Sequence, residues 1–382
     1  MPHFMLCGTE TAEVIACEFF PADGRVEQRQ VITVSPNELG LENGAPGGIA
    51  VEWVVWHPSG NAAYALISHW DNAPGAIRTL TVSASGELAL TGELVSTGGY
   101  QPCHAFIDGT HLLMGALCES NPATRERLEG HGGPDHSFAS FSAHYLSGNV
   151  SVVDVSDMLQ PKLLQSAPMP DMRTGGPTPH AEPFKACGVH GSVPGERSPL
   201  CHGIATSPAG NWLVAGDAGQ TMIVTWAYDR KSSTPLQNVR SQAAPTPTPV
   251  GENTIVGPPS NMGHRPRHVA FNADGTRLFI VHEFNNVITM HEFDPSTADL
   301  GPALATMPTF PYDAAALPAG FFHGAAEVAL HRSGKLFVST RGFIRRRVHD
   351  TSNVRAFSID GELAVAQDVT TLKNPRTFTF DA

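Results

Sequence analysis

A steady internal period constrains this chain more than any other feature of its sequence. An alternating strand pattern, a polar turn and a second short strand recur, with starts at Glu13, Arg78, Asn149, Thr221, Val287 and Asn353. Successive starts lie 65, 71, 72, 66 and 66 residues apart. A repeat of this size is typical of folds in which each unit buries its apolar faces against neighbouring units.

A second hairpin pattern is interleaved with the first. It consists of an apolar strand, a tight turn and another apolar strand, and its turn glycines are Gly60, Gly109, Gly210, Gly275 and Gly334. One hairpin of each pattern makes a four-stranded antiparallel sheet with two apolar faces, which a lone sheet cannot bury. We therefore predict an all-β fold in which the sheets stack as blades of a β-propeller. A set of β-sandwich domains, the alternative, would not produce one regular period.

Composition excludes several other classes of protein. The 382 residues include 37 Gly and 31 Pro, which destabilise helix interiors, so helical bundles and coiled coils are excluded. No stretch approaches the roughly 18 consecutive apolar residues of a membrane helix. The N-terminus lacks the basic and apolar regions of a signal peptide. We expect a soluble protein of the cytoplasm that does not act at a membrane.

The charge balance argues against nucleic acid as a partner. The chain has 24 Lys and Arg against 36 Asp and Glu, a net charge of -12, and such a surface repels phosphate backbones. The basic run 345–347 is predicted to be a solvated loop or a rim that steers anionic substrate. The six cysteines show no C-x-x-C spacing and are predicted to be buried free thiols; they are Cys7, Cys17, Cys103, Cys118, Cys187 and Cys201.

Three segments interrupt the repeats and are predicted to be long loops of a single propeller domain that spans residues 1–382. They lie at about 121–145, 167–199 and 241–261. The first two are rich in histidine: His131, His136, His144, His180 and His190. No spacing holds these histidines on one rigid element, so we predict polar loops and no metal site. No dinucleotide, P-loop, zincin or serine-hydrolase motif occurs, and no cofactor is predicted.

Four short motifs, taken in order, resemble one known family. They are Gly98-Gly-Tyr-Gln-Pro-Cys-His104, then Cys201-His202, then Arg265-Pro-Arg-His268 followed by His282-Glu283, and last Ala326-Glu327 followed by Ser339-Thr-Arg341-Gly. With them the sequence resembles the propeller-type 6-phosphogluconolactonases, which are related to the fungal carboxymuconate cyclases. The resemblance runs from Leu6 to Phe378 and so covers nearly the whole chain.

The resemblance implies seven blades, with a C-terminal strand that closes the ring, whereas about six blade repeats are visible. Either the chain is a fragment of a seven-bladed protein, or a strand at Arg376 to Phe380 closes a six-bladed ring onto strands near Phe4 and Val14. The chain stops at Ala382, where a turn is expected, and this favours the fragment.

The resemblance also implies an active site. Its catalytic set falls on His202, Arg267, Glu283 and Arg341, and His104, His268 and Glu327 are expected as substrate-binding neighbours. We expect the four catalytic side chains to converge at one mouth of the channel. Opening a lactone needs a base that takes a proton from water, here His202 or Glu283. It also needs fixed cations for the developing oxyanion and for an anionic substituent. Each of these side chains could instead serve as an inter-blade hydrogen bond or salt bridge.

The function that follows is an expectation with alternatives. We expect a lactonase of carbohydrate metabolism, in the pentose phosphate pathway, that hydrolyses 6-phosphoglucono-δ-lactone or a related sugar lactone. Its ligand would be a small anionic lactone, and the chain would be a monomer or weak homodimer. A carboxymuconate-type cycloisomerase and a non-catalytic propeller that serves as an interaction platform are the alternatives.

Overall fold

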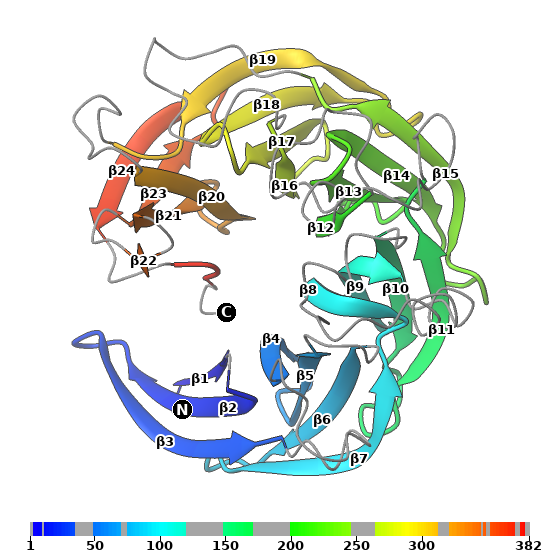
Figure 1. The fold of residues 1–382 in the computed structure, drawn as a ribbon, viewed down its shortest axis with the longest axis vertical. Coiled ribbons are helices and arrows are strands. Elements are labelled where there is room, and N and C mark those ends of the chain that lie inside the picture. The colour runs from blue at the N-terminus through cyan, green and yellow to red at the C-terminus, as the bar shows by residue number, and fades with distance from the viewer. Residues whose placement is uncertain are drawn as a thin grey trace, which may run out of the picture. The chain divides into compact units, whose positions relative to one another are not determined.

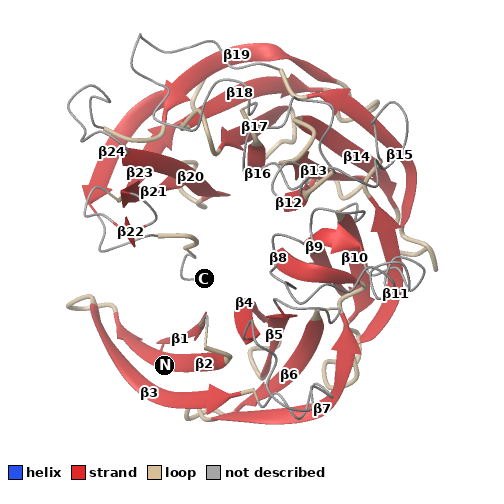
Figure 2. Cartoon of the chain, viewed as in Figure 1, coloured by secondary structure: helices blue, strands red, loops and turns tan. Residues whose placement is uncertain are grey.

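The described part of the chain folds as β-sheet throughout (Figure 2). The computed structural model describes residues 3–9, 11–34, 49–69, 75–119, 148–170, 199–245, 264–311, 321–344, 347–348, 352–370 and 375–378. These residues form 24 strands and no helix. Within those ranges, no helix has the length and apolar character that crossing a membrane requires.

The first of two compact units comprises Met1–Cys187, Ser198–Cys201 and Asp229–Leu236. It contains three antiparallel sheets whose strands follow one another in chain order (Figure 1). The first sheet is β1 (His3–Gly8), β2 (Glu13–Phe20) and β3 (Arg25–Thr33); the second is β4 (Ile49–Trp56), β5 (Ala62–His69), β6 (Ala76–Val82) and β7 (Leu88–Ser96); the third is β8 (Gly99–Asp108), β9 (His111–Glu119), β10 (Asn149–Asp154) and β11 (Lys162–Pro168). Neighbouring sheets meet through their first strands, β1 with β4 and β4 with β8.

The second unit comprises Gly188–Arg197, His202–Tyr228 and Gln237–Ala382. Its three sheets have the same plan, with β13 against β16 and β16 against β20. The first sheet is β12 (Cys201–Thr206), β13 (Trp212–Asp217), β14 (Met222–Tyr228) and β15 (Leu236–Ala243); the second is β16 (Pro266–Phe271), β17 (Arg277–His282), β18 (Val287–Phe293) and β19 (Leu300–Pro308); the third is β20 (Phe321–Leu330), β21 (Leu336–Ile344), β23 (Asn353–Ser358) and β24 (Ala364–Thr370), with β22 (Arg347–Val348) beside β21.

The middle sheet of each unit is buried on both faces. On β17, Leu278 and Ile280 enter one core and Phe279 and Val281 enter the other. β5 divides its side chains between two cores in the same way. Alternation places successive residues on opposite faces of a strand, so a strand that is apolar throughout needs a neighbour on both sides. This is the packing that the interleaved repeats predict, and both hairpin patterns are confirmed in the strand pairings.

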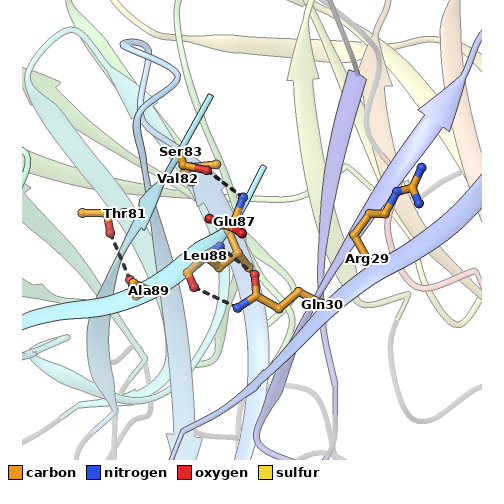
Figure 3. Close-up of a pocket in the computed structure, with 8 residues that line it drawn as sticks. All are labelled: Arg29, Gln30, Thr81, Val82, Ser83, Glu87, Leu88 and Ala89. Atoms are coloured by element: carbon orange, nitrogen blue, oxygen red, sulfur yellow. Dashed lines mark hydrogen bonds between the residues drawn. The ribbon is translucent and has the colours of Figure 1, made fainter. Parts of the chain in front are cut away.

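A groove in the first unit lies where β3 meets β7 (Figure 3). Its lining residues are Arg29, Gln30, Thr81, Val82, Ser83, Glu87, Leu88 and Ala89. The Gln30 Nε2 donates to the Leu88 carbonyl at 2.9 Å, and the Leu88 N–H donates to Gln30 Oε1 at 2.8 Å. This pair of bonds imitates a backbone ladder and joins the outer strands of two sheets. In the second unit the Leu300 N–H donates to Gln242 Oε1 at 3.3 Å. We interpret the groove as a seam between sheets.

Several expectations about loops and cysteines need correction. Residues 167–168 belong to β11 and 241–243 to β15, because ladder pairing continues beyond the predicted loop boundary; the rest of the insertions and their five histidines lie almost wholly outside the described residues. A closing strand at Arg376 to Phe380 is one prediction from the sequence, but the described residues 375–378 do not form a strand. Cys7 is exposed and Cys17 half-buried, since they lie on the face of the first sheet away from its core. Cys103 and Cys201 are buried free thiols as predicted. The single-domain prediction stays a prediction.

Candidate active site

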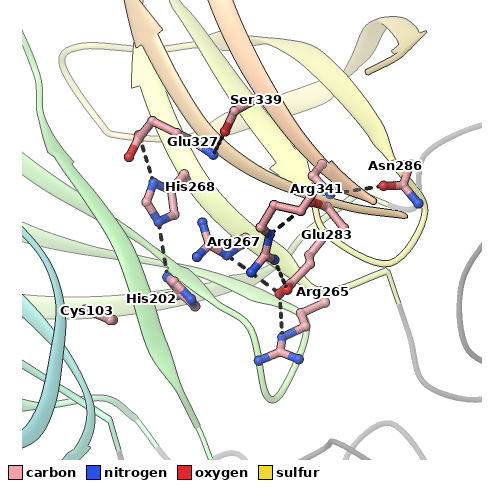
Figure 4. A network of polar contacts seen from close by, with 12 residues as sticks. Cys103, His202, Arg265, Arg267, His268, Glu283, Asn286, Glu327, Ser339 and Arg341 are labelled. Carbon is pink, nitrogen blue, oxygen red and sulfur yellow. Dashed lines mark hydrogen bonds and ion pairs between the residues drawn. The ribbon is translucent and has the colours of Figure 1, made fainter. Parts of the chain in front are cut away.

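Three of the predicted catalytic side chains meet at one carboxylate in the second unit. Glu283 directly follows β17, and its backbone N–H donates to the Arg265 carbonyl at 3.0 Å. The Arg341 Nη2 on β21 donates to Glu283 Oε1 at 2.5 Å. The Nε atoms of Arg265 and Arg267 lie 3.1 and 3.7 Å from Glu283 Oε2 (Figure 4). Three arginines therefore surround a single buried glutamate.

A β-bulge at the start of β16 places the arginines. The register shifts between Pro266, which pairs with His282, and His268, which pairs with Val281. Arg267 is thus the extra residue, and a bulge of this kind re-aims the side chain that it carries. Arg265 precedes the proline in the left-handed region, with φ +51. Both distortions of the strand occur where charged side chains turn toward Glu283.

A glycine lets β12 approach β16 closely enough for two histidines to bond. A Cβ on Gly203 would lie 2.5 Å from the His268 Cα, far closer than atoms pack, so only glycine fits there. Its neighbour His202 then places Nδ1 3.1 Å from His268 Nε2. The other ring nitrogen of His268, Nδ1, lies 2.9 Å from Glu327 Oε1. The result is a buried chain from His202 through His268 to Glu327.

The proton positions in this chain follow from its carboxylate end. Glu327 Oε1 already accepts the Val328 N–H at 3.0 Å, and an ionised carboxylate only accepts, so His268 Nδ1 carries the proton. Burial, followed by the charge of Arg267, holds the pKa of both His202 and His268 well below its usual value. A neutral His268 then accepts at Nε2 from His202 Nδ1–H, and His202 Nε2 carries the lone pair.

Glu283 and Arg267 are both charged at neutral pH, although each is buried. Burial opposes a charge on Glu283, but Arg265, Arg341 and Arg267 outweigh it and lower its pKa to about 2. Burial and Arg341 lower the pKa of Arg267 to about 9 despite Glu283, so Arg267 is still cationic at neutral pH. Glu283 is therefore a permanent anion that holds the arginines together.

Arg267 has hydrogen-bonding capacity that the protein does not use. The side chain is 2% exposed. Its Nε and Nη1 atoms and the Glu283 Oε2 atom have no hydrogen-bond partner among the described residues, although Nε lies at ion-pair distance, 3.7 Å, from that oxygen. A buried donor that stays unsatisfied costs about 1–3 kcal/mol, and more when charged. Figure 4 shows Arg267 between the His202–His268–Glu327 chain and Glu283. A bound anion or oxyanion would satisfy these donors.

A second buried chain of polar side chains lies beside the first. The His291 Nδ1 donates to the Gly301 carbonyl at 3.1 Å. A neutral His291 must then accept at Nε2 from the Thr289 hydroxyl at 2.8 Å. That hydroxyl accepts from His282 Nε2 at 2.9 Å, and His282 Nδ1 accepts from His264 Nδ1 at 2.8 Å. Burial lowers the pKa of His264 to about 4, so this hydrogen-bonded chain of side chains is uncharged at neutral pH. It ends on a carbonyl and cannot pass a proton on. Two of its members, His264 and His282, directly precede Arg265 and Glu283 in the sequence.

The remaining predicted residues have different outcomes. His104 lies in the first unit, edge-on to Trp53 with ring centroids 5.0 Å apart, and its substrate-binding role stays a prediction. The sequence did not single out the roles of Arg265, His264 or Thr377. Arg265 is the first residue of the quoted motif that contains Arg267, and His264 directly precedes that motif; this adjacency is the only signal that could have pointed to them. Of the basic run predicted to be a loop, Arg345 and Arg346 lie outside the described residues, whereas Arg347 belongs to β22, because its backbone pairs with Ile344 of β21.

Comparison with known proteins places the fold in a family. The family model described as Lactonase, 7-bladed beta-propeller matches residues 134–382. The chain belongs to this lactonase family. The match confirms the resemblance and the predicted propeller class; the family fold has seven blades, and the described residues form six sheets. No curated protein matches this lactonase-family chain in sequence.

Solved structures agree with this fold. A protein from Bacteroides fragilis NCTC 9343, assigned as a 6-phosphogluconolactonase, is 14% identical, with a TM-score of 0.63 over 100% of this chain and 85% of that chain. The periplasmic gluconolactonase of Pseudomonas aeruginosa is 19% identical, with a TM-score of 0.62 over 97% of this chain and 83% of that chain. At these identities the likeness establishes the fold alone.

Proposed function

We propose that this lactonase-family chain hydrolyses the lactone of an acidic sugar, 6-phosphoglucono-δ-lactone or a close relative. The observation that carries the proposal is the buried Arg267, whose unsatisfied N–H donors lie beside a histidine chain. A cation whose donors the described residues leave unsatisfied, next to a neutral imidazole, is the pairing that ester opening needs, because charge develops on the carbonyl oxygen while water loses a proton.

His202 is the general base in this proposal. Glu283, the other candidate, has a pKa of about 2, and both of its carboxylate oxygens already face arginines. Burial lowers the pKa of His202 as well, but its Nε2 lone pair is not committed to an ion pair with any arginine that the structure describes. His202 is neutral, with its Nε2 lone pair set by the bond to His268. When Nε2 takes a proton from water, the His202 ring becomes positively charged, and the Glu327 carboxylate, bonded to His268, stabilises that charge. A positioned base of this kind contributes about 10²–10⁴-fold to the rate.

The arginines act on the negative charges of substrate and intermediate. Water adds to the lactone carbonyl as His202 removes its proton, which gives a tetrahedral oxyanion beside Arg267. Collapse of the intermediate breaks the bond to the ring oxygen, and the His202 imidazolium returns the proton to that oxygen. The product is the open hydroxy acid, and the base is regenerated. Arg341, fixed by Glu283, is suited to hold a phosphate or carboxylate substituent.

The proposal is tested with purified chain and 6-phosphogluconolactone, with spontaneous opening subtracted. We expect acceleration by the protein, and Arg267→Gln is expected to lower kcat/KM by about 100-fold to 1,000-fold. The matched control is Arg277→Gln, an arginine of β17 that is part-exposed and pairs with Glu292. A folded wild-type protein without any acceleration would refute the lactonase proposal, and equal loss in both variants would refute the role of Arg267. The cytoplasmic location, the lack of a cofactor and the oligomeric state stay predictions.

A further inference from the structure

The described C-terminal residues 375–378 contact the candidate site. The Thr377 hydroxyl donates to Glu327 Oε2 at 3.2 Å, across 50 positions of sequence. The segment pairs with no strand, so a backbone ladder does not explain why it lies there. The contact falls on the carboxylate that orients His268, and it therefore bears on the proposed base.

The hydrogen bonds of Glu327 show what Thr377 does. Oε1 accepts from His268 Nδ1 at 2.9 Å and from the Val328 N–H at 3.0 Å. Oε2 accepts from Thr377, so donors on both oxygens fix the plane of the carboxylate. That plane sets the orientation of the His268 ring, and the ring in turn sets the bond to His202 Nδ1 at 3.1 Å. Thr377 thus acts on the base through two intervening groups.

Arg376 directly precedes Thr377 in the sequence, so the bond from Thr377 to Glu327 also brings the positive charge of Arg376 close to the site. Its charge lowers the pKa of His202, Arg267, His268 and Arg341, in each case after burial and other nearby charges. Among the described residues of the site, arginines outnumber carboxylates: Arg265, Arg267, Arg341 and Arg376 against Glu283 and Glu327. The whole chain, in contrast, has a net charge of -12.

We propose that residues 375–378 complete the active site, with Thr377 as a positioning residue for Glu327 and Arg376 as a determinant of preference for anionic lactones over uncharged ones. The proposal rests on the proposed function for its substrate. The two residues affect different kinetic constants. Thr377 acts on the base and therefore on kcat, whereas Arg376 attracts the charged part of the substrate and therefore acts on KM.

The role of Thr377 is tested by paired substitutions. Thr377→Val removes the hydroxyl at nearly constant shape and is expected to lower kcat about threefold to tenfold, with KM unchanged and the acid limb of the pH profile displaced. Thr377→Ser keeps the hydroxyl and is expected to restore both kcat and the profile. A valine variant that is folded and matches the wild type in kcat and pH profile would overturn the positioning role, and so would a serine variant as impaired as the valine one.

The role of Arg376 is tested by substrate charge. Arg376→Gln is expected to raise KM for 6-phosphogluconolactone about tenfold and to leave KM for uncharged glucono-δ-lactone unchanged. The KM of Arg376→Lys for 6-phosphogluconolactone should lie between those of the wild type and of Arg376→Gln. An equal change for both lactones would overturn the proposal. Calorimetric titration with the product 6-phosphogluconate separates this inference from the proposed function. Even in a protein without turnover, weaker binding by Arg376→Gln than by wild type is expected, and equal binding contradicts the inference.

Discussion

Strands β8 and β16 begin with the same backbone and carry different chemistry. Gln101 and Arg265 each precede a proline, with φ +54 and +51. In both strands the register shifts directly after that proline. A left-handed residue followed by a bulge is a costly arrangement for non-glycine residues, and each of the two units forms it once at these positions. The bulge therefore occurs in sheets with and without the candidate site and is not specific to the site.

The side chains that the two bulges present are what separates them. The residue after the proline is Cys103 in β8 and Arg267 in β16. Cys103 Sγ lies within hydrogen-bonding distance of the Cys201 and Gly115 carbonyls, at 3.4 and 3.5 Å. Arg267, in contrast, has buried donors that none of the described residues satisfies. By the strand registers, Leu117 occupies in β9 the position that Glu283 occupies after β17. Cation and carboxylate are thus both absent from one bulge and both present in the other.

The largest expected effect comes from making β16 resemble β8. Glu283→Leu leaves the buried Arg267 and the part-buried Arg265 and Arg341 without their common counter-charge. It is expected to lower the free energy of unfolding by about 3–5 kcal/mol. The double variant Arg267→Cys/Glu283→Leu removes one of those charges as well and should recover about 1–2 kcal/mol of that loss. Urea unfolding of the two single variants, the double variant and the wild type measures the coupling. Strictly additive losses would show that the two residues do not depend on each other.

A second prediction concerns acid, since the β16 region contains neutral buried histidines. An unfolded histidine binds a proton near pH 6.5, but the pKa of buried His264 is about 4. The unfolded state therefore binds more protons as the pH falls, and the free energy of unfolding falls with it. For His264 the loss begins below pH 6.5, is complete near pH 4, and amounts to about 3 kcal/mol. The pKa of Glu283, about 2, adds a further loss only below about pH 4.5.

Urea unfolding between pH 7.5 and 4.5 measures this dependence. His264→Phe removes one of the titrating groups and is expected to reduce the slope of unfolding free energy against pH; the remaining slope comes from other buried histidines, such as His202 and His268, whose pKa is also lowered. Thr289→Val breaks the same hydrogen-bonded chain without removing a titrating group, so it should lower stability and keep the wild-type slope. If His264→Phe retained the full slope, His264 would not be the neutral buried group that its bond to His282 indicates.

The sequence predicts the fold better than it predicts the site, and the reason is physical. Strand alternation and glycine turns are local and repeat in every blade, so β17 and its neighbours could be predicted from residue patterns. The residues Arg267, Glu283 and Arg341 could be chosen by resemblance, and they do meet. The bond from Thr377 to Glu327 joins residues 50 positions apart and has no periodic signature. The left-handed Arg265 has none either, because no glycine marks it.

The smallest expected effect tests whether the two bulges share their backbone strain. A left-handed conformation costs an L-residue roughly 1–2 kcal/mol, and the greater freedom of an unfolded glycine offsets roughly 0.5–1 kcal/mol of the relief. Gln101→Gly should therefore be about 1 kcal/mol more stable than Gln101→Ala. Arg265→Gly should exceed Arg265→Ala by the same amount, although both Arg265 variants lose the contact with Glu283 and the Gln101 variants do not. Urea midpoints of the four variants supply the two differences. Glycine and alanine both lack the original side chain, so the stability difference between the two variants at one position reports the backbone alone. Unequal differences at positions 101 and 265 would mean that the two backbones differ in strain. Equal differences would mean that only the side chains distinguish β16 from β8.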